Sequence, residues 1–232
     1  MNPSQVNEIV NELKENGIVK IPNYILKKEL ILIQKEVISE LKRLKLDHHV
    51  KSGKVSGTSE VFQQVSRLSQ RIEPPRALEK YTFALHQILF ELFGKKFDFD
   101  EKPQLLLTVP QKTEWTLNGL KWHVDSFTSP LTSLQFFLLI DDVKPYGGGT
   151  LVLKGSHKFK KRLALNQIDQ LLDSKQLNEK FEFDQINMSI FELNGTVGDV
   201  YLMDMRLLHS PSLNVSDKIR MMATYRFYSK NS

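Results

Sequence analysis

The chain has 232 residues, which is long enough for one sizeable hydrophobic core and short for two. Charged residues make up 25% and hydrophobic residues 41%, so disorder, collagen and a coiled coil are excluded as overall descriptions. There is no cysteine, which excludes disulfides, thiolate metal sites and a cysteine nucleophile. The net charge of +5 is a mild surplus that argues weakly for an anionic substrate and more weakly for nucleic acid.

The first residues carry no basic start followed by an apolar block, which a secretory signal would show. No apolar run approaches the roughly 18 residues that a membrane helix needs. We therefore expect a cytoplasmic protein that binds a small molecule and neither a membrane nor nucleic acid. We expect it to be a monomer or a weak homodimer.

The first part of the chain, about residues 1–100, reads as helical. Ser4 is the expected N-cap of a helix that stops at Asn16-Gly17, and a short strand at 18–21 follows. Apolar residues at helical spacing predict a second helix over 27–46, and Pro74-Pro75 opens a third over 76–93.

Residues 47–60 interrupt this pattern with two glycines, two lysines and two adjacent histidines. The segment is a solvated connection or, alternatively, a lid that closes over an active site. As a lid it would place His48, Lys51 and Lys54 as candidates for contacting an anionic group.

The pattern of residue types changes after Pro103. Short aromatic and β-branched runs alternate with Gly and Pro clusters, which indicates a barrel or a two-sheet jelly roll of about residues 101–232. Residues 160–178 look like a helical insertion. We expect one domain over 1–232, mainly β, with the N-terminal helices against the β core. The predicted strands are 104–109, 133–140, 150–153, 180–183, 198–203 and 219–228.

The segment Lys121-Trp122-His123-Val124-Asp125-Ser126 carries the most chemical information. In a strand, residues two apart point to the same face, so His123 and Asp125 can bind one metal ion. A polar pair without metal remains the alternative until further ligands join it.

His209 is a candidate third ligand, because a jelly roll brings distant strands together. Two histidines and one carboxylate on one face of an iron ion leave three open positions, as in non-haem Fe(II) oxygenases. A hydrogen-bonded core histidine is the alternative for His209 alone.

Arg220 opens the apolar strand 219–228. A guanidinium that points into a barrel needs a partner, because burying an unpaired charge is very costly. The carboxylate of a ligand would satisfy it through a bidentate pair, whereas an arginine exposed at the strand end needs no such partner.

Together these residues resemble the phytanoyl-CoA dioxygenase family of Fe(II)- and 2-oxoglutarate-dependent oxygenases. The resemblance covers about residues 104–228 and, more loosely, the N-terminal helices. It rests on the order and spacing of several pieces, which are Trp122-His123-Val124-Asp125, Gly148-Gly149-Thr150-Leu151, Gly155-Ser156-His157, Gly198-Asp199-Val200, His209 and Arg220.

The resemblance implies a double-stranded β-helix (a cupin-like jelly roll) that binds Fe(II), 2-oxoglutarate and O2, with ascorbate as a supporting reductant. It implies that His123, Asp125 and His209 bind the iron and that Arg220 binds the distal carboxylate of 2-oxoglutarate. Further candidates for cosubstrate contacts are Thr150, Gln104 and Ser212. His157 is read as structural.

The chemistry implied is hydroxylation of a small molecule, with release of succinate and CO2. Halogenating relatives lack the acidic ligand, so Asp125 favours hydroxylation or a related oxidation over halogenation. Two other functions stay open: a cupin-type isomerase or hydrolase that uses the same ligands with zinc or manganese, and a jelly-roll binding module without catalysis. The primary substrate cannot be read from the sequence.

Overall fold

A computed structural model describes residues 2–45, 68, 70–94, 97–100, 102–127, 131–161 and 163–229. The segment 47–60, interpreted as a connector or a lid, lies outside the described residues. The described helices are α1 (Pro3–Asn16), α2 (Lys27–Arg43), α4 (Lys80–Phe93) and α5 (Leu165–Leu172), with 3-10 turns at Arg76–Leu78 and Ser156–Lys158.

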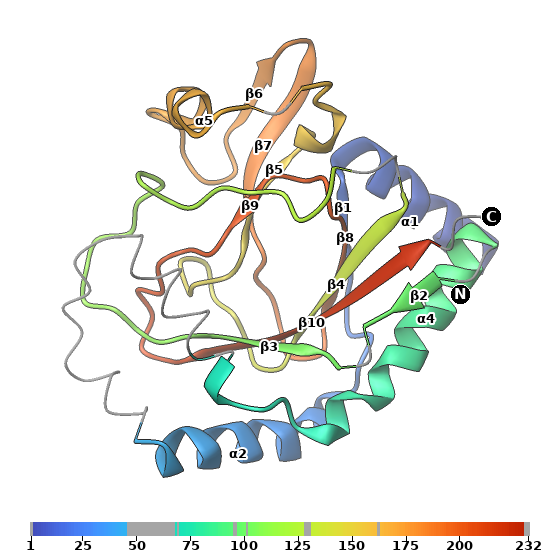
Figure 1. The fold of residues 1–232 in the computed structure, drawn as a ribbon, viewed down its shortest axis with the longest axis vertical. Coiled ribbons are helices and arrows are strands. Elements are labelled where there is room, and N and C mark those ends of the chain that lie inside the picture. Colours follow the sequence, from blue (N-terminus) through green and yellow to red (C-terminus); the bar gives the residue numbers. More distant parts are fainter. Residues whose placement is uncertain are drawn as a thin grey trace.

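The strands form two antiparallel sheets, seen in Figure 1. The larger sheet has the order β1-β8-β4-β10-β2, with β3 also paired to β10, and the smaller has the order β6-β7-β5-β9. Their bounds are β1 (Ile18–Ile21), β2 (Phe97–Phe99), β3 (Gln104–Thr108), β4 (Ser133–Leu139), β5 (Leu151–Lys154), β6 (Lys180–Phe183), β7 (Ile186–Glu192), β8 (Val200–Asp204), β9 (His209–Ser210) and β10 (Arg220–Ser229).

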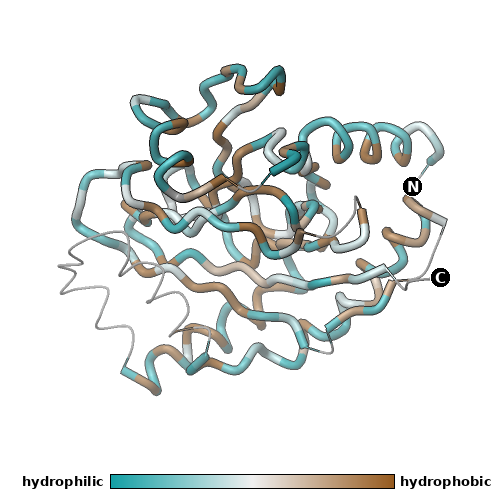
Figure 2. The backbone as a smooth tube through the Cα atoms, turned by 45° about the horizontal axis from the view of Figure 1, so that its top comes forward, coloured by the Kyte–Doolittle hydropathy of each residue, from teal (hydrophilic) through white to brown (hydrophobic). Residues whose placement is uncertain are grey.

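The alternation of side chains along each strand divides the core into layers. On β4, Leu134, Phe136 and Leu138 join the helices in one cluster on the outer side of the large sheet. Phe137 and Leu139 point the other way and meet residues of the small sheet. A third cluster covers the outer side of the small sheet beneath α5. Figure 2 shows the hydrophobic stretches gathered along the strands and the hydrophilic ones around the periphery.

The helices begin and end largely where their sequence signals lie. The C-cap of α1 is Gly17 and that of α4 is Gly94, both in the left-handed conformation. The predicted N-cap at Ser4 is wrong, because the Asn2 side chain accepts from the Gln5 N–H at 2.9 Å and caps the helix instead. Among the described residues, no helix combines the length and apolarity needed to cross a membrane.

Most predicted strands are present, with ends shifted by one or two residues. Three strands were not predicted: β2, β7 and the two-residue β9. The segment that holds His123 and Asp125 is not a regular strand, since it makes a single bridge between His123 and His209. The predicted insertion at 160–178 contains one helix, α5.

Candidate metal centre

His123 and His209 are held together by their own backbones. The N–H of each donates to the carbonyl of the other at 2.9 Å, and the two imidazole centroids lie 4.2 Å apart. The same segment is held further along, where the Asp125 N–H donates to the Met205 carbonyl at 3.0 Å. These backbone bonds bring residues 123–125 beside the strand β9.

Both imidazoles are oriented in the same way. Nδ1 of His123 lies 2.8 Å from the Lys121 carbonyl, and Nδ1 of His209 lies 3.0 Å from the Leu207 carbonyl. Because a carbonyl can only accept, Nδ1 carries the proton in each ring. Both Nε2 atoms therefore face the Asp125 carboxylate, each at 3.8 Å from one of its oxygens.

The three side chains form a set that fits a divalent metal ion. One ligand atom from each of His123, Asp125 and His209 lies within 4.8 Å of the others. Burial, reinforced by the nearby His123, lowers the pKa of His209 to about 4, so that its ring is neutral near pH 7. Two imidazoles and one carboxylate suit Fe(II) and leave open positions for other ligands.

Arg220 lies inside the protein, with 3% of its surface exposed. Its Nε donates to the Gly148 carbonyl at 2.7 Å, Nη1 to the Leu106 carbonyl at 3.1 Å and Nη2 to the Thr108 hydroxyl at 2.5 Å. Burial lowers its pKa to about 10, which still leaves it charged near pH 7. Arg220 forms no ion pair within the described part of the chain, so its charge is available for an anionic ligand.

Glu192 is the acidic residue of this region, and the sequence interpretation did not include it. Its carboxylate accepts from the Tyr146 N–H at 2.5 Å and the Gly149 N–H at 2.9 Å. Burial raises its pKa to about 7, although these two N–H groups and the charge of Arg220 oppose the rise. The charge of Arg220 is therefore compensated only in part by Glu192 near neutral pH.

The glycine run at 147–149 lets these groups approach closely. Gly148 has a φ of +80°, and a Cβ placed there would lie 2.7 Å from the Cβ of Asn214. Glycine at position 148 is thus needed for the backbone geometry beside Arg220.

The other residues predicted to contact the cosubstrate, Thr150, Ser212 and Gln104, do not all lie in the same part of the structure. Thr150 and Ser212 are buried, and the Ser212 hydroxyl donates to the Gly149 carbonyl at 2.7 Å, one residue after the Gly148 carbonyl that accepts from Arg220. Gln104 is exposed at the far end of β3, opposite Thr224, whereas Arg220 pairs with Thr108. The structure therefore does not bring Gln104 to Arg220. His157 contacts the Lys14 carbonyl through Nε2 at 3.0 Å, in keeping with a structural role.

The sequence profile of one family, described as phytanoyl-CoA dioxygenase (PhyH), matches residues 14–222. The match begins near the end of α1, ends in the first residues of β10, and includes the three metal-ligand candidates and Arg220. The chain belongs to the phytanoyl-CoA dioxygenase family. The family resemblance read from the sequence is thereby confirmed. No curated protein matches the sequence directly.

Solved structures with the same fold match this chain at low sequence identity. One is the non-heme alpha-ketoglutarate-dependent epimerase SnoN of nogalamycin biosynthesis, with a TM-score of 0.65 and 18% identity over 98% of this chain and 82% of that chain. Another is EctD from S. alaskensis, solved with 2-oxoglutarate and 5-hydroxyectoine, with a TM-score of 0.64 and 15% identity over 99% and 76%.

A third is AviO1 from Streptomyces viridochromogenes, with a TM-score of 0.66 and 12% identity over 100% of this chain and 98% of that chain. These likenesses confirm the predicted jelly-roll fold of the family. Because identity is low, they show the fold and not the substrate.

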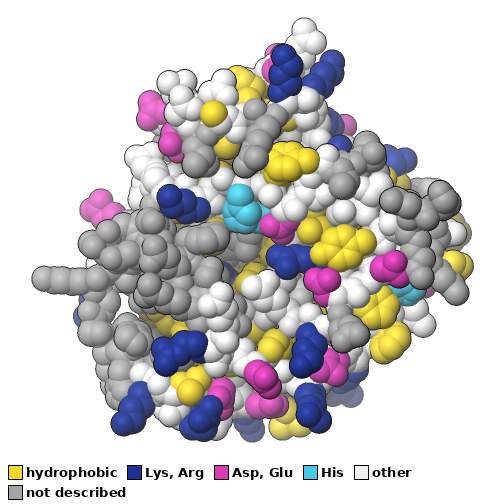
Figure 3. Space-filling model, in the orientation of Figure 1, with side chains coloured by type: hydrophobic (Ala, Val, Ile, Leu, Met, Phe, Trp, Pro, Cys, Tyr) yellow, Lys and Arg dark blue, Asp and Glu magenta, His cyan; other side chains and the backbone are white. Residues whose placement is uncertain are grey.

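A pocket of about 680 Å³ opens beside His123. Aromatic and basic side chains line it, and none of its described lining residues is acidic. Figure 3 shows histidine, acidic and basic side chains next to one another at a hollowed part of this face. The side chains that characterise the pocket are Trp122, Phe127, Phe159, Lys160, Lys161 and Arg206.

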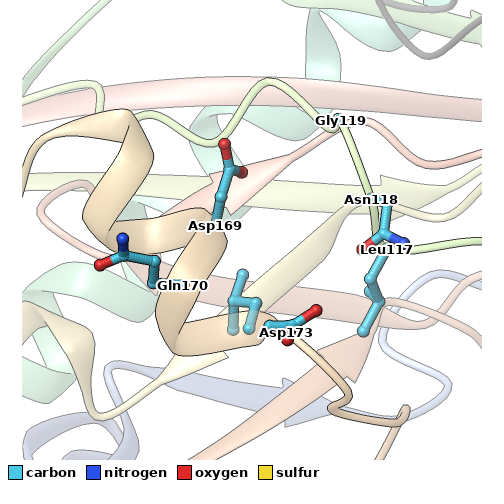
Figure 4. A pocket seen from close by; sticks show the side chains of 7 residues that line it. Leu117, Asn118, Gly119, Asp169, Gln170 and Asp173 are labelled. Atoms are coloured by element: carbon cyan, nitrogen blue, oxygen red, sulfur yellow. The ribbon is translucent and has the colours of Figure 1, made fainter.

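A separate pocket of about 460 Å³ lies between residues 117–119 and α5, as Figure 4 shows. Its acidic side chains are Asp169 and Asp173, and it shares no lining residue with the pocket beside His123. This second pocket is therefore not part of the metal centre.

Arg226 is the residue at the metal centre that the sequence interpretation missed. Its Nη2 lies 3.5 Å from Oδ2 of Asp125. A signal for it was present, because Arg226 is six residues after Arg220 on a predicted strand, and an even spacing puts both side chains on one face.

Proposed function

We propose that this protein is an Fe(II)- and 2-oxoglutarate-dependent oxygenase, built as one domain, that hydroxylates a small molecule. The observation that carries the proposal is the convergence of His123, Asp125 and His209, with both Nδ1 atoms bonded to carbonyls and both Nε2 atoms directed at the carboxylate. A ring whose Nδ1 is held by a carbonyl is pre-oriented to bind a metal through Nε2.

In this proposal His123, Asp125 and His209 hold the iron, and Arg220 binds the distal carboxylate of 2-oxoglutarate. A buried guanidinium that lacks an ion-pair partner among the described residues provides the oriented, charged fork that a carboxylate requires. In this proposal the buried hydroxyls of Thr150 and Ser212 are further candidates for contacts with the cosubstrate. The Lys121 and Leu207 carbonyls keep the proton on Nδ1 of each histidine, so that Nε2 faces the metal site.

The chemistry that a bound iron supplies is oxygen activation coupled to oxidative decarboxylation of 2-oxoglutarate, giving succinate and CO2. Asp125 occupies the acidic ligand position, which favours hydroxylation over a reaction that needs a halide there. An isomerase or hydrolase with the same metal ligands has no use for a buried Arg220 that lacks an ion-pair partner among the described residues, so the oxygenase is the function that this arrangement supports best.

We further propose that the substrate is a small molecule with apolar and anionic parts. The pocket beside His123 combines aromatic walls with Lys160 and Lys161, for which the described residues provide no ion pair. EctD was solved with 5-hydroxyectoine and SnoN with nogalamycin RO, both small molecules. The proposal includes a cytoplasmic enzyme that is a monomer or a weak homodimer, and cell fractionation and analytical ultracentrifugation would test both points.

The decisive experiment measures succinate formed from 2-oxoglutarate with Fe(II), O2 and ascorbate. We expect slow turnover by the wild type even without primary substrate, and none by His209→Gln. The matched control is His86→Gln, because the His86 ring contacts the Phe97 carbonyl and is not among the three converging ligands. A wild type that neither forms succinate nor binds 2-oxoglutarate in the presence of Ni(II) would refute the proposal.

A further inference from the structure

The face of the large sheet that points toward the small sheet carries a set of polar side chains in addition to Arg220. On β10, Met222 belongs to the cluster between the two sheets, whereas Met221 and Ala223 belong to the cluster under the helices. Because side chains alternate, Thr224 and Arg226 lie on the inner face with Met222. Gln135 of β4 is the direct partner of Arg226 across the sheet and lies on the same face as Phe137.

These inner-face residues have buried atoms without a hydrogen-bond partner. Thr224 is 2% exposed and Gln135 is 3% exposed. Within the described part of the chain, Thr224 Oγ1, Gln135 Oε1 and Arg226 Nε have no partner. A buried polar atom without a partner is costly, and three neighbouring ones on one wall indicate a site that a ligand completes.

The position of this group relates it to the metal centre. Arg226 Nη2 lies 3.5 Å from Asp125 Oδ2, and no other carboxylate among the described residues forms an ion pair with Arg226. A divalent metal, the Asp125 carboxylate and the metal-bound carboxylate of 2-oxoglutarate sum to zero charge. Arg226 then contributes a positive charge that neither Asp125 nor this carboxylate balances. One further negative charge beside the metal would balance it.

The unpartnered atoms also differ in what they need. Arg226 Nε donates and the Thr224 hydroxyl can donate, which suits an oxyanion, whereas Gln135 Oε1 accepts and needs an N–H or O–H donor. At neutral pH, 2-oxoglutarate carries hydrogen-bond acceptors and no donor. A carboxylate with a nearby hydroxyl or amino group satisfies all three atoms.

We propose that Arg226, Thr224 and Gln135 form a carboxylate-binding subsite on the inner wall beside Asp125, and that its ligand is a carboxylate of the primary substrate with a neighbouring hydroxyl or amino donor. The inference rests on the proposed function and deepens it, because it assigns a substrate class and specificity-determining residues. It places the substrate's anchoring group next to the metal ligands, so that the oxidised carbon is close to that group.

The test uses the full chain loaded with Ni(II) and saturating 2-oxoglutarate, with 3-hydroxybutanoate and butanoate as probes in calorimetric or ligand-detected NMR titrations. We expect the wild type to prefer 3-hydroxybutanoate, and Arg226→Gln to bind both probes at least about tenfold more weakly. Thr224→Val should weaken both probes while keeping the fold, because the change is nearly isosteric. Gln135→Leu should remove the preference for the hydroxylated probe.

The control is Arg43→Gln, which removes the same charge from the exposed surface of α2. If Arg226→Gln binds the probes like this control, or if the wild type binds neither probe, the subsite does not exist. If 2-oxoglutarate itself binds about tenfold more weakly to Arg226→Gln, the carboxylate belongs to the cosubstrate and the substrate assignment is wrong. A wild type that binds no 2-oxoglutarate refutes the proposed function instead, so that the two failures are distinguishable.

Discussion

Replacing Arg220 with lysine keeps the buried charge and removes the fork geometry. In the wild type the guanidinium spans three acceptors, which are the Gly148 carbonyl, the Leu106 carbonyl and the Thr108 hydroxyl. A single ammonium nitrogen cannot span these acceptors and also present two parallel N–H groups to a carboxylate.

The size of the effect follows from the bonds lost. Loss of one charge-assisted hydrogen bond to 2-oxoglutarate costs about 1.5–3 kcal/mol, so the dissociation constant should rise about 10- to 100-fold. Loss of two hydrogen bonds to buried acceptors should lower the free energy of unfolding by about 2 kcal/mol or more. The variant should therefore be folded, less stable and poor at binding 2-oxoglutarate.

Calorimetric titration of 2-oxoglutarate into the Ni(II)-loaded variant measures the first quantity, and urea denaturation measures the second. Arg43→Lys on the exposed surface of α2 is the matched control and should change neither. The affinity for Ni(II) should stay within about twofold of the wild type, because Arg220 is not a metal ligand. If Arg220→Lys binds 2-oxoglutarate as tightly as the wild type, the assignment of Arg220 is wrong.

Three further outcomes are expected. Asp125→Ala should bind Ni(II) at least about 100-fold more weakly while its circular dichroism stays native, and unchanged metal affinity would contradict the ligand set. The raised pKa of Glu192, about 7, means that the folded state favours its neutral form; stability from this group is fully present below the ordinary value of 4.5 and is lost as the pH rises to about 7. The free energy of unfolding of the wild type, relative to that of Glu192→Gln, should therefore fall by about 3 kcal/mol between these two pH values in denaturant titrations. A difference between the two proteins that does not change with pH would refute the pKa shift. Gly148→Ala should lower the free energy of unfolding by about 1–3 kcal/mol and weaken 2-oxoglutarate binding, because its φ is +80° and its carbonyl accepts from Arg220; unchanged values for both would contradict this role.

Local patterns determined several features of this protein. The helix stops at Gly17 and Gly94 follow from the freedom of glycine to adopt a left-handed conformation, which depends on the residue itself. The His123–Asp125 pair is likewise local, because two residues with one residue between them are close in any extended backbone. The alternation of side chains along β10 is local too, and it predicts that Arg220 shares one face of the strand with Arg226.

Other features depended on partners distant in the sequence. Sequence spacing could make His209 a candidate third ligand, but only its backbone bridge to His123 places the two rings 4.2 Å apart. The capping of α1, in contrast, is decided locally, because Asn2 and Gln5 form a reciprocal pair of bonds, although Ser4 is an equally good cap by type. The strand β7, which carries Glu192, was not predicted from its own sequence and pairs with β5 and β6.

Arg226 shows most clearly what only the tertiary structure decided. The sequence places it on the same strand face as Arg220, but its chemical meaning comes from Asp125 at 3.5 Å and from Gln135 across the sheet. Strand register is set by packing over the whole core, and a slip of one residue would send every side chain of β10 to the opposite face. Sequence periodicity reports which residues share a face, whereas the charges and unpartnered atoms that meet there are determined by which strands pair.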